Sequence, residues 1–167
     1  MELLEGIYSR RSVREFTADP VAPEQVTEIL AAGSWAPSGL NNQPWRFVVV
    51  RDGEARRELA KLTKYQRIIE NAPVSLAVFC DRDAMYNDMK DHQGIGACLQ
   101  NMLLAAHALG LGAVWLGEIV NRGDEARNLL GLPEEMELMA VVAVGHPEGR
   151  SRTSKRKGLE ALVLKEI

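Results

Sequence analysis

The stretch HQGIGACLQNMLLAAHAL, residues 92–109, decides the fold. Apolar side chains recur there at the spacing of a helix, at positions 95, 98, 99, 102, 103, 106 and 109. Leu104, Ala105 and Ala108 fill the positions between them, so the helix is apolar nearly all round. A helix of this kind must be covered on most sides. We therefore expect layers of other elements over it, and more cover than one subunit of 167 residues readily supplies.

The segments on either side alternate between helical and extended patterns. Helices are expected over residues 2–11, from Pro23 onward, over 54–62 and over 124–130. Strands are expected over 45–51, 74–80, 113–117 and 138–145. The alternation predicts one domain of three layers, with about four strands between helices. Residues 147–167 form an extension that is too short to fold alone and must pack on something.

Composition excludes several classes of function. The net charge is −3, which gives no bulk reason to expect nucleic acid binding. The N-terminus is acidic, and the most apolar stretch, residues 102–116, is too short to cross a bilayer, so we expect neither a signal peptide nor a membrane span. The only cysteines, Cys80 and Cys98, lie in apolar runs, which favours reduced, buried thiols in the cytoplasm. The three histidines are scattered without ligand-like spacing, so no metal is expected.

Two basic runs stand out in this mildly acidic chain: SRRSVREF at residues 9–16 and RSRTSKRK at 150–157. The first could simply place cations at the end of a helix, and the second could be a solvated tail. However, arginine presents a fork of donors that suits phosphate, and both runs could gather around one anion. No glycine loop for a nucleotide phosphate is found, so a phosphate would be held by side chains.

Two further stretches contain residues that are suited to binding a planar ligand. The loop APSGLNNQPW, residues 36–45, could be a connection shaped by proline and glycine, but it also carries donors and acceptors that suit a heteroaromatic ring. The stretch WLGE, residues 115–118, could be a strand that ends in a glycine turn. Alternatively, Gly117 lets a backbone approach a flat ligand closely.

In this order, the pieces resemble the FMN-dependent nitroreductase family. The resemblance rests on RRSVR, PSGLNNQPW, QNMLLAAHALGLG followed by WLG, and the C-terminal RKGLE, and it runs from about residue 3 to residue 162. The tail motif departs from the family at Gly158, where proline is usual. The resemblance implies an α+β fold of three layers over residues 1–167, with a central mixed sheet. It also implies a homodimer with FMN at the subunit interface and a C-terminal segment that packs on the partner.

The resemblance also implies which residues bind the cofactor, and it assigns no catalytic side chain. Contacts to the phosphate, the ribityl chain and the O2 edge of the flavin would come from Arg10, Arg11, Ser12 and Arg14. The ring would be lined from the other subunit by Pro37, Ser38, Gly39 and Asn41. Leu116 and Gly117 would lie along the flavin near N5, and Arg156 would return to the phosphate. Only residues 64–89 could cover the substrate site, so we expect it to be open and shallow.

The activity that follows is a ping-pong reduction. NADH or NADPH would reduce FMN, and an electron-poor acceptor such as a nitroaromatic compound or a quinone would then take its place. Glu118, the nearest acid to the expected ring, receives no role. An alternative is a flavin-binding module for storage or sensing, without steady-state turnover. A small RNA- or protein-binding domain that works through its basic tail would need aromatic residues among the cations, and RSRTSKRK has none.

Overall fold

The computed structural model describes residues 1–149 and 153–167. Within these ranges the strands are β1 (Trp45–Val50), β2 (Val74–Asp81), β3 (Gly112–Leu116) and β4 (Met136–Gly145). The helices are α1 (Leu3–Ser9), α2 (Pro23–Ser34), α3 (Gly53–Ala60), α4 (Gln66–Asn71), α5 (Asp88–Ala108) and α6 (Gly123–Leu129). Short 3₁₀ turns follow at η1 (Gly39–Asn41), η2 (Arg82–Ala84), η3 (Glu118–Arg122) and η4 (Leu159–Ala161). The strands expected from the sequence are confirmed, whereas α4 was not expected.

The four strands form one sheet in the order β1-β2-β4-β3. Each neighbouring pair is antiparallel, with Trp45 opposite Cys80 and Ala113 opposite Val144. The sheet proper is therefore not mixed, because β4 inserts between β2 and β3 and runs opposite to both. Parallel pairing occurs only as an isolated bridge between Ser12 and Ala113 within the described residues.

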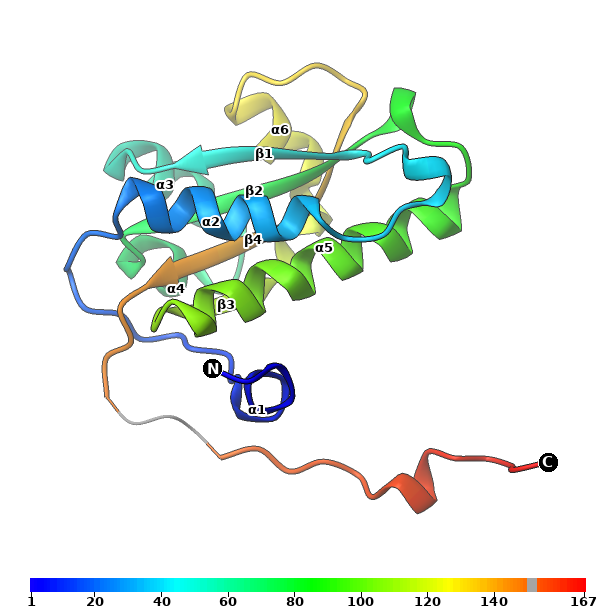
Figure 1. The fold of residues 1–167 in the computed structure, drawn as a ribbon. Helices are drawn as coiled ribbons and strands as arrows, with labels where there is room; N and C mark the ends of the chain where they lie inside the picture. The colour runs from blue at the N-terminus through cyan, green and yellow to red at the C-terminus, as the bar shows by residue number, and fades with distance from the viewer. Residues whose placement is uncertain (150–152) are drawn as a thin grey trace.

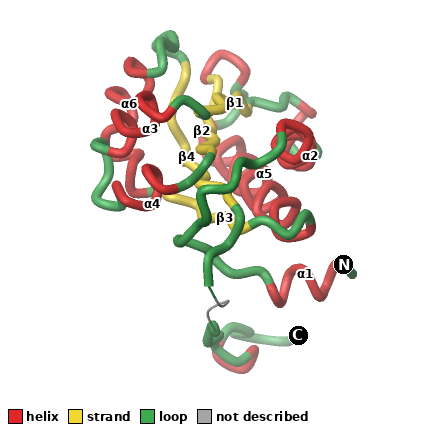
Figure 2. The backbone as a smooth tube through the Cα atoms, turned by 90° about the vertical axis from the view of Figure 1, so that its left-hand side faces the viewer, coloured by secondary structure: helices red, strands yellow, loops and turns green. Residues whose placement is uncertain are grey.

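Helices cover both faces of the sheet, which confirms the three layers (Figures 1 and 2). One face packs on α2 and α5, and the other on α3, α4 and α6. Strand β2 shows the consequence, because successive side chains point to opposite faces. Leu76 and Val78 belong to the first cluster and Ala77 and Phe79 to the second, and all four are buried. The continuous apolar run of β2 follows from this double cover.

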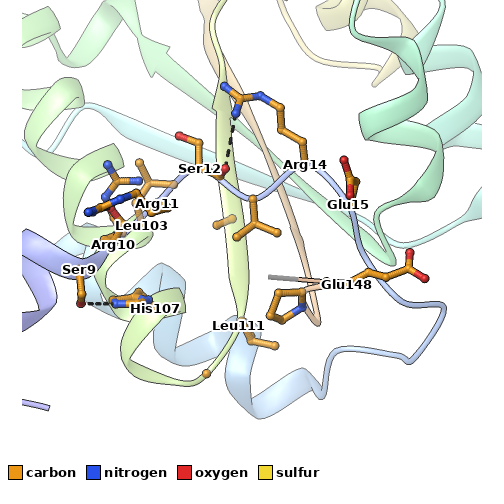
Figure 3. Close-up of a pocket in the computed structure, with 15 residues that line it drawn as sticks. Ser9, Arg10, Arg11, Ser12, Arg14, Glu15, Leu103, His107, Leu111 and Glu148 are labelled. Atoms are coloured by element: carbon orange, nitrogen blue, oxygen red, sulfur yellow. Dashed lines mark hydrogen bonds between the residues drawn. The ribbon is translucent and has the colours of Figure 1, made fainter. Parts of the chain in front are cut away.

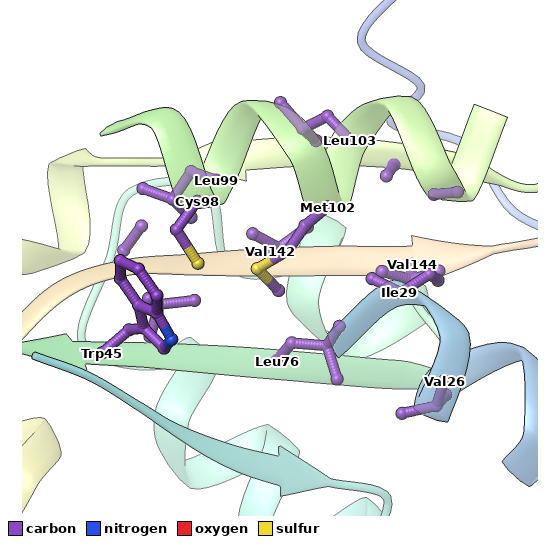
Figure 4. Packing of buried hydrophobic residues seen from close by; sticks show 14 of the residues in the cluster. Val26, Ile29, Trp45, Leu76, Cys98, Leu99, Met102, Leu103, Val142 and Val144 are labelled. Carbon is purple, nitrogen blue, oxygen red and sulfur yellow. The ribbon is translucent and has the colours of Figure 1, made fainter. Parts of the chain in front are cut away.

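The long helix α5 lies at the centre of the first cluster (Figure 4). Cys98 and Met102 project from it toward the strands that carry Leu76 and Val142. The helix begins at Asp88, four residues before the expected start at His92. Its N-cap is Asn87, whose Oδ1 accepts a hydrogen bond of 3.1 Å from the N–H of Lys90.

The C-terminal segment does not join these layers. Every residue from 153 to 167 is exposed, including five large apolar side chains. They are Leu159, Leu162, Val163, Leu164 and Ile167. Figure 1 shows this segment running past α1 and away from the sheet. The first three residues of the basic run RSRTSKRK lie outside the described residues.

Candidate functional site

The N-terminal arginine segment, residues 10–14, lies along the free edge of β3. The N–H of Val13 donates to the carbonyl of Ala113 at 3.1 Å, next to the parallel bridge from Ser12. Gly112 permits this approach, because a Cβ at that position would lie 2.6 Å from Val13 Cγ1. The backbone of the arginine segment is thus fixed by strand pairing, which leaves its polar side chains available for other partners.

A cavity of about 370 Å³ opens beside the arginine segment (Figure 3). Its wall comes from residues 9–15, from the end of α5 and the start of β3, and from residues 147–149. Ser9 Oγ and His107 Nε2 lie 2.8 Å apart and join the end of α1 to the last turn of α5. Sequence reasoning missed this pair, because its members lie 98 positions apart and nothing in either stretch predicts that they meet.

Among the described residues that line this cavity, Arg10 has the most buried nitrogen atoms without a hydrogen-bond partner. Its Nε and Nη1 atoms are buried and have no hydrogen-bond partner among the described residues. Burial lowers the pKa of Arg10, and the charges of Arg156 and Arg11 lower it further. The structure thus brings the charges of both chain ends into range of each other. A half-buried guanidinium beside two more cations favours an anion as its partner, and arginine suits the oxygens of a phosphate.

The other expected phosphate ligands are less constrained. Arg11 Nη1 donates to the carbonyls of Tyr8 at 2.7 Å and of Arg10 at 2.9 Å, while its buried Nε has no partner among the described residues. Arg14 is exposed and makes only a long contact of 3.4 Å to the carbonyl of Ser12 among the hydrogen bonds described. Arg156 is exposed and donates to Ser154 Oγ. The residues present therefore fit the phosphate of FMN.

The second expected group, Pro37, Ser38, Gly39 and Asn41, lies in a strained loop. Leu40, Asn41 and Gln43 have φ values of 55°, 56° and 47°, in the left-handed region that disfavours side chains. Each such residue costs about 1–2 kcal/mol relative to a right-handed conformation. A Cβ on Gly39 would lie 1.9 Å from Tyr86 Oη, so a side chain there would force the Tyr86 ring to move. The loop is held against the start of α5, where the carbonyl of Pro37 lies 3.5 Å from a Cβ built on Gly94.

These two groups lie at opposite ends of α5 (Figure 1). The loop contacts the helix at Gly94, and the arginine segment reaches it at His107 through Ser9. Thirteen residues of helix separate these points, which is about 20 Å. A single subunit does not bring the two groups together.

The third expected element is the end of β3. Leu116 is buried, and a Cβ on Gly117 would meet only the Trp115 ring at 3.5 Å, so nothing among the described residues requires glycine there. Next to it, the Glu118 carboxylate accepts hydrogen bonds from Thr63 Oγ1 at 2.6 Å and from the N–H of Lys64 at 3.2 Å. The hydrogen bond from Thr63 is the main cause that holds the pKa of Glu118 below its usual value. Glu118 thus ties the turn after α3 to the end of β3.

Two further observations hold for the part of the chain that the structure describes. There, histidine, cysteine and acidic side chains do not gather in any group of three that could hold a metal ion. None of the helices there is both long and apolar enough to cross a membrane.

Comparison with known proteins identifies close relatives. The model of the nitroreductase family matches residues 7–64 and 61–146. A candidate NADH dehydrogenase or NAD(P)H nitroreductase of Archaeoglobus fulgidus is 37% identical over 150 residues, which cover 88% of this chain and 86% of that relative.

Two solved structures superpose closely. A candidate nitroreductase from Desulfovibrio desulfuricans, solved in complex with FMN, has a TM-score of 0.95 and 50% identity, with 99% of this chain and 97% of that one covered. The NADPH:FMN oxidoreductase of Vibrio harveyi, solved with NAD⁺, has a TM-score of 0.89 and 32% identity, with 97% and 76% covered.

Proposed function

We propose that this chain, which belongs to the nitroreductase family and is an FMN-dependent NAD(P)H oxidoreductase, works by a ping-pong mechanism. In this mechanism the oxidised nicotinamide leaves before an electron-poor acceptor binds in its place. The proposed acceptor is a nitroaromatic compound, a quinone or a similar oxidant. The single observation in this chain that carries the cofactor's placement is Arg10, whose buried Nε and Nη1 atoms have no partner among the described residues.

The roles of this chain's residues follow from the positions described above. FMN, when bound, would supply the redox chemistry between the nicotinamide donor and the acceptor. Arg10, Arg11 and Arg156 would hold the phosphate, with Ser12 and Arg14 on the ribityl chain and the O2 edge of the ring. Charge-assisted hydrogen bonds of this kind contribute about 1.5–3 kcal/mol each.

We propose a homodimer because the site is incomplete in one subunit. The loop that carries Pro37, Ser38, Gly39 and Asn41 would line the ring bound to the partner's arginine segment, since about 20 Å of α5 separates the two groups within one chain. The exposed apolar side chains from Leu159 to Ile167 support an exchange of C-terminal segments, because apolar surface of this kind marks an interface. Leu116 and Gly117 would lie along the ring.

The proposed location is the cytoplasm. Cys80 and Cys98 are both free and buried. Burial raises the pKa of Cys80 to about 11 and that of Cys98 to about 12, which keeps both as unreactive thiols. This use of cysteine is typical of a reducing compartment.

An anaerobic titration tests the function. The FMN-loaded protein is mixed with NADH or with NADPH, and the absorbance of oxidised flavin at about 450 nm is followed. We expect bleaching with at least one donor and recovery of the absorbance when a quinone is added. The absence of bleaching with both donors would remove the reductase function, and bleaching without turnover by any acceptor would favour storage or sensing.

Sedimentation tests the dimer. We expect the FMN-loaded chain of residues 1–167 to sediment as a dimer, and a chain that ends at Gly158 to lose both the dimer and most of its bound FMN. A monomer that keeps its FMN would contradict the shared site.

A further inference from the structure

A buried carboxylate outside the expected site joins the strained loop to the start of α5. Asp91, in the first turn of α5, is 1% exposed. Its Oδ2 accepts hydrogen bonds from the N–H of Tyr86 at 3.0 Å and from that of Asn87 at 2.8 Å. Its Oδ1 accepts one of 2.6 Å from Asn42 Nδ2. One side chain thus holds the segment before α5 and the loop that contains Asn42.

The orientation of Asn42 is fixed by the same contacts. Its Nδ2 also donates to the carbonyl of Ala84 at 2.9 Å, so both amide hydrogens are used. If the amide were reversed, its oxygen would face the Asp91 carboxylate and the Ala84 carbonyl. All of these oxygens are acceptors, so no hydrogen bond could form. Three donors therefore converge on Asp91, and both of its oxygens are needed to accept from them.

The loop on which Asp91 acts is the one that needs restraint. Leu40, Asn41 and Gln43, which surround Asn42, all have left-handed φ values, whereas Asn42 itself is right-handed at φ −74°. Strained backbone of this kind persists only where the surroundings over-determine it. Asp91 also holds the backbone of Tyr86, whose ring lies directly over Gly39. The carboxylate thus restrains the loop from two sides.

The electrostatics of Asp91 agree with this arrangement. Burial alone raises the pKa of a carboxyl group, but the hydrogen bonds from Asn42, Asn87 and Tyr86, together with the nearby His92, hold the pKa of Asp91 below its ordinary value. The group is therefore a carboxylate at neutral pH. A role in the helix dipole alone would not require burial, since Asp88 in the same turn has a side chain that is 87% exposed.

We propose that Asp91 is a positioning residue for the flavin site: through Asn42 and Tyr86 it holds the loop 37–43 in the conformation that lines the ring. It does not contact the cofactor. The inference rests on the proposed function in one respect, which is that this loop faces FMN.

The experiment measures FMN affinity in apo-protein by flavin fluorescence, the visible circular dichroism of bound FMN, and the melting temperature. The main variant is Asn42→Ala, because alanine suits the right-handed backbone of residue 42 and leaves the Asp91 contacts to Tyr86 and Asn87 intact. Asp91→Asn keeps the shape but sets an NH₂ group against N–H donors. Asp88→Asn is the matched control in the same helical turn. Asn41→Gly removes a side chain expected at the flavin and keeps the left-handed backbone.

We expect Asn42→Ala and Asp91→Asn each to raise the FMN dissociation constant about tenfold and to change the circular dichroism of the flavin. The double variant should bind FMN no more weakly than the single variant with the lower affinity, because both changes remove the same hydrogen bond between Asn42 and Asp91. Asp88→Asn should match the wild type in all three measurements. If Asp91→Asn does not fold, Asn42→Ala decides the question alone.

Two results would overturn the inference. One of them would leave the proposed FMN site standing, and the other would contradict that site as well. If Asn41→Gly weakens FMN binding while Asn42→Ala leaves affinity and circular dichroism unchanged, the positioning role is wrong and the proposed site stands. If Asn41→Gly also has no effect, the loop does not face the flavin, and both the placement of the cofactor and the inference fail.

Discussion

The arginine segment and the strained loop serve one proposed site by opposite means. The arginine segment has its backbone fixed by pairing with β3, and its guanidinium groups remain short of partners. The strained loop has its backbone held in unfavourable conformations by side chains, among them Asn42 on Asp91 and Ser38, whose Oγ accepts from the N–H of Gln43. The first region has guanidinium nitrogens that lack an anionic partner, and the second has strained backbone. Cofactor binding should therefore relieve the first region and depend on the rigidity of the second.

Loss of the arginine fork should have the largest effect. We expect Arg10→Gln to raise the FMN dissociation constant about 10–100-fold, because it removes charge-assisted hydrogen bonds to the phosphate. The same change should leave the apo-protein as stable as before or more stable, since Arg10 is desolvated beside Arg11 and Arg156 without an acceptor among the described residues.

Fluorescence titration and thermal melting measure the two quantities. Lys61→Gln is the control, since Lys61 forms an exposed ion pair with Glu58 in the i,i+3 arrangement. A large loss of apo stability in Arg10→Gln would mean that Arg10 is structural.

The strand pairing that fixes the arginine segment can be broken at Gly112. A Cβ there would lie 2.6 Å from Cγ1 and 2.7 Å from Cβ of Val13, a β-branched side chain with little freedom to move. We expect Gly112→Ala to lower the free energy of unfolding by about 1–3 kcal/mol and to weaken FMN binding as well. Urea denaturation measures the first effect. Gly96→Ala is the control, because a Cβ at Gly96 meets nothing within 4 Å. Equal stability of the two variants would show that the segment is not fixed by this pairing.

Acid should weaken the restraint on the strained loop, because it protonates the Asp91 carboxylate. The folded-state pKa of Asp91 is lowered, so its stabilisation is present above the unfolded value of about 4 and is lost as the pH falls through the folded pKa. We therefore expect the stability difference between wild type and Asp91→Asn to be about 1.5–3 kcal/mol at about pH 5 and smaller at about pH 3.

Urea denaturation at both pH values checks the sign. Two other titratable groups face Asp91: His92 from α5 and Cys80 from β2. Burial raises the pKa of Cys80 to about 11, so Cys80 remains a thiol at both pH values and does not affect the comparison. A difference that grows toward acid pH would contradict a carboxylate with a lowered pKa.

The two regions also differ in how far the sequence reveals them. The arginine segment was predictable because its signal is local: three arginines stand within five residues, and helix and strand patterns flank them. The composition of the loop was also visible, but its restraint was not, because 49 residues separate Asn42 from Asp91. Nothing about Leu40 predicts a left-handed backbone. The order of the strands was hidden for a similar reason, since β4 pairs between two strands that precede it in the chain.

The smallest expected effect separates charge from geometry inside the arginine segment. Arg14 is exposed, and its one described hydrogen bond is a long contact to the Ser12 carbonyl, so its fork is not held in place. We expect Arg14→Lys, which keeps the charge, to raise the FMN dissociation constant only a few-fold. Arg10→Lys should cost more, because a lysine cannot present two parallel donors from a fixed plane. Fluorescence titration of the two variants at equal ionic strength compares them directly. If Arg14→Lys proved the weaker binder, the fork that matters would lie at residue 14, and the buried nitrogens of Arg10 would need another explanation.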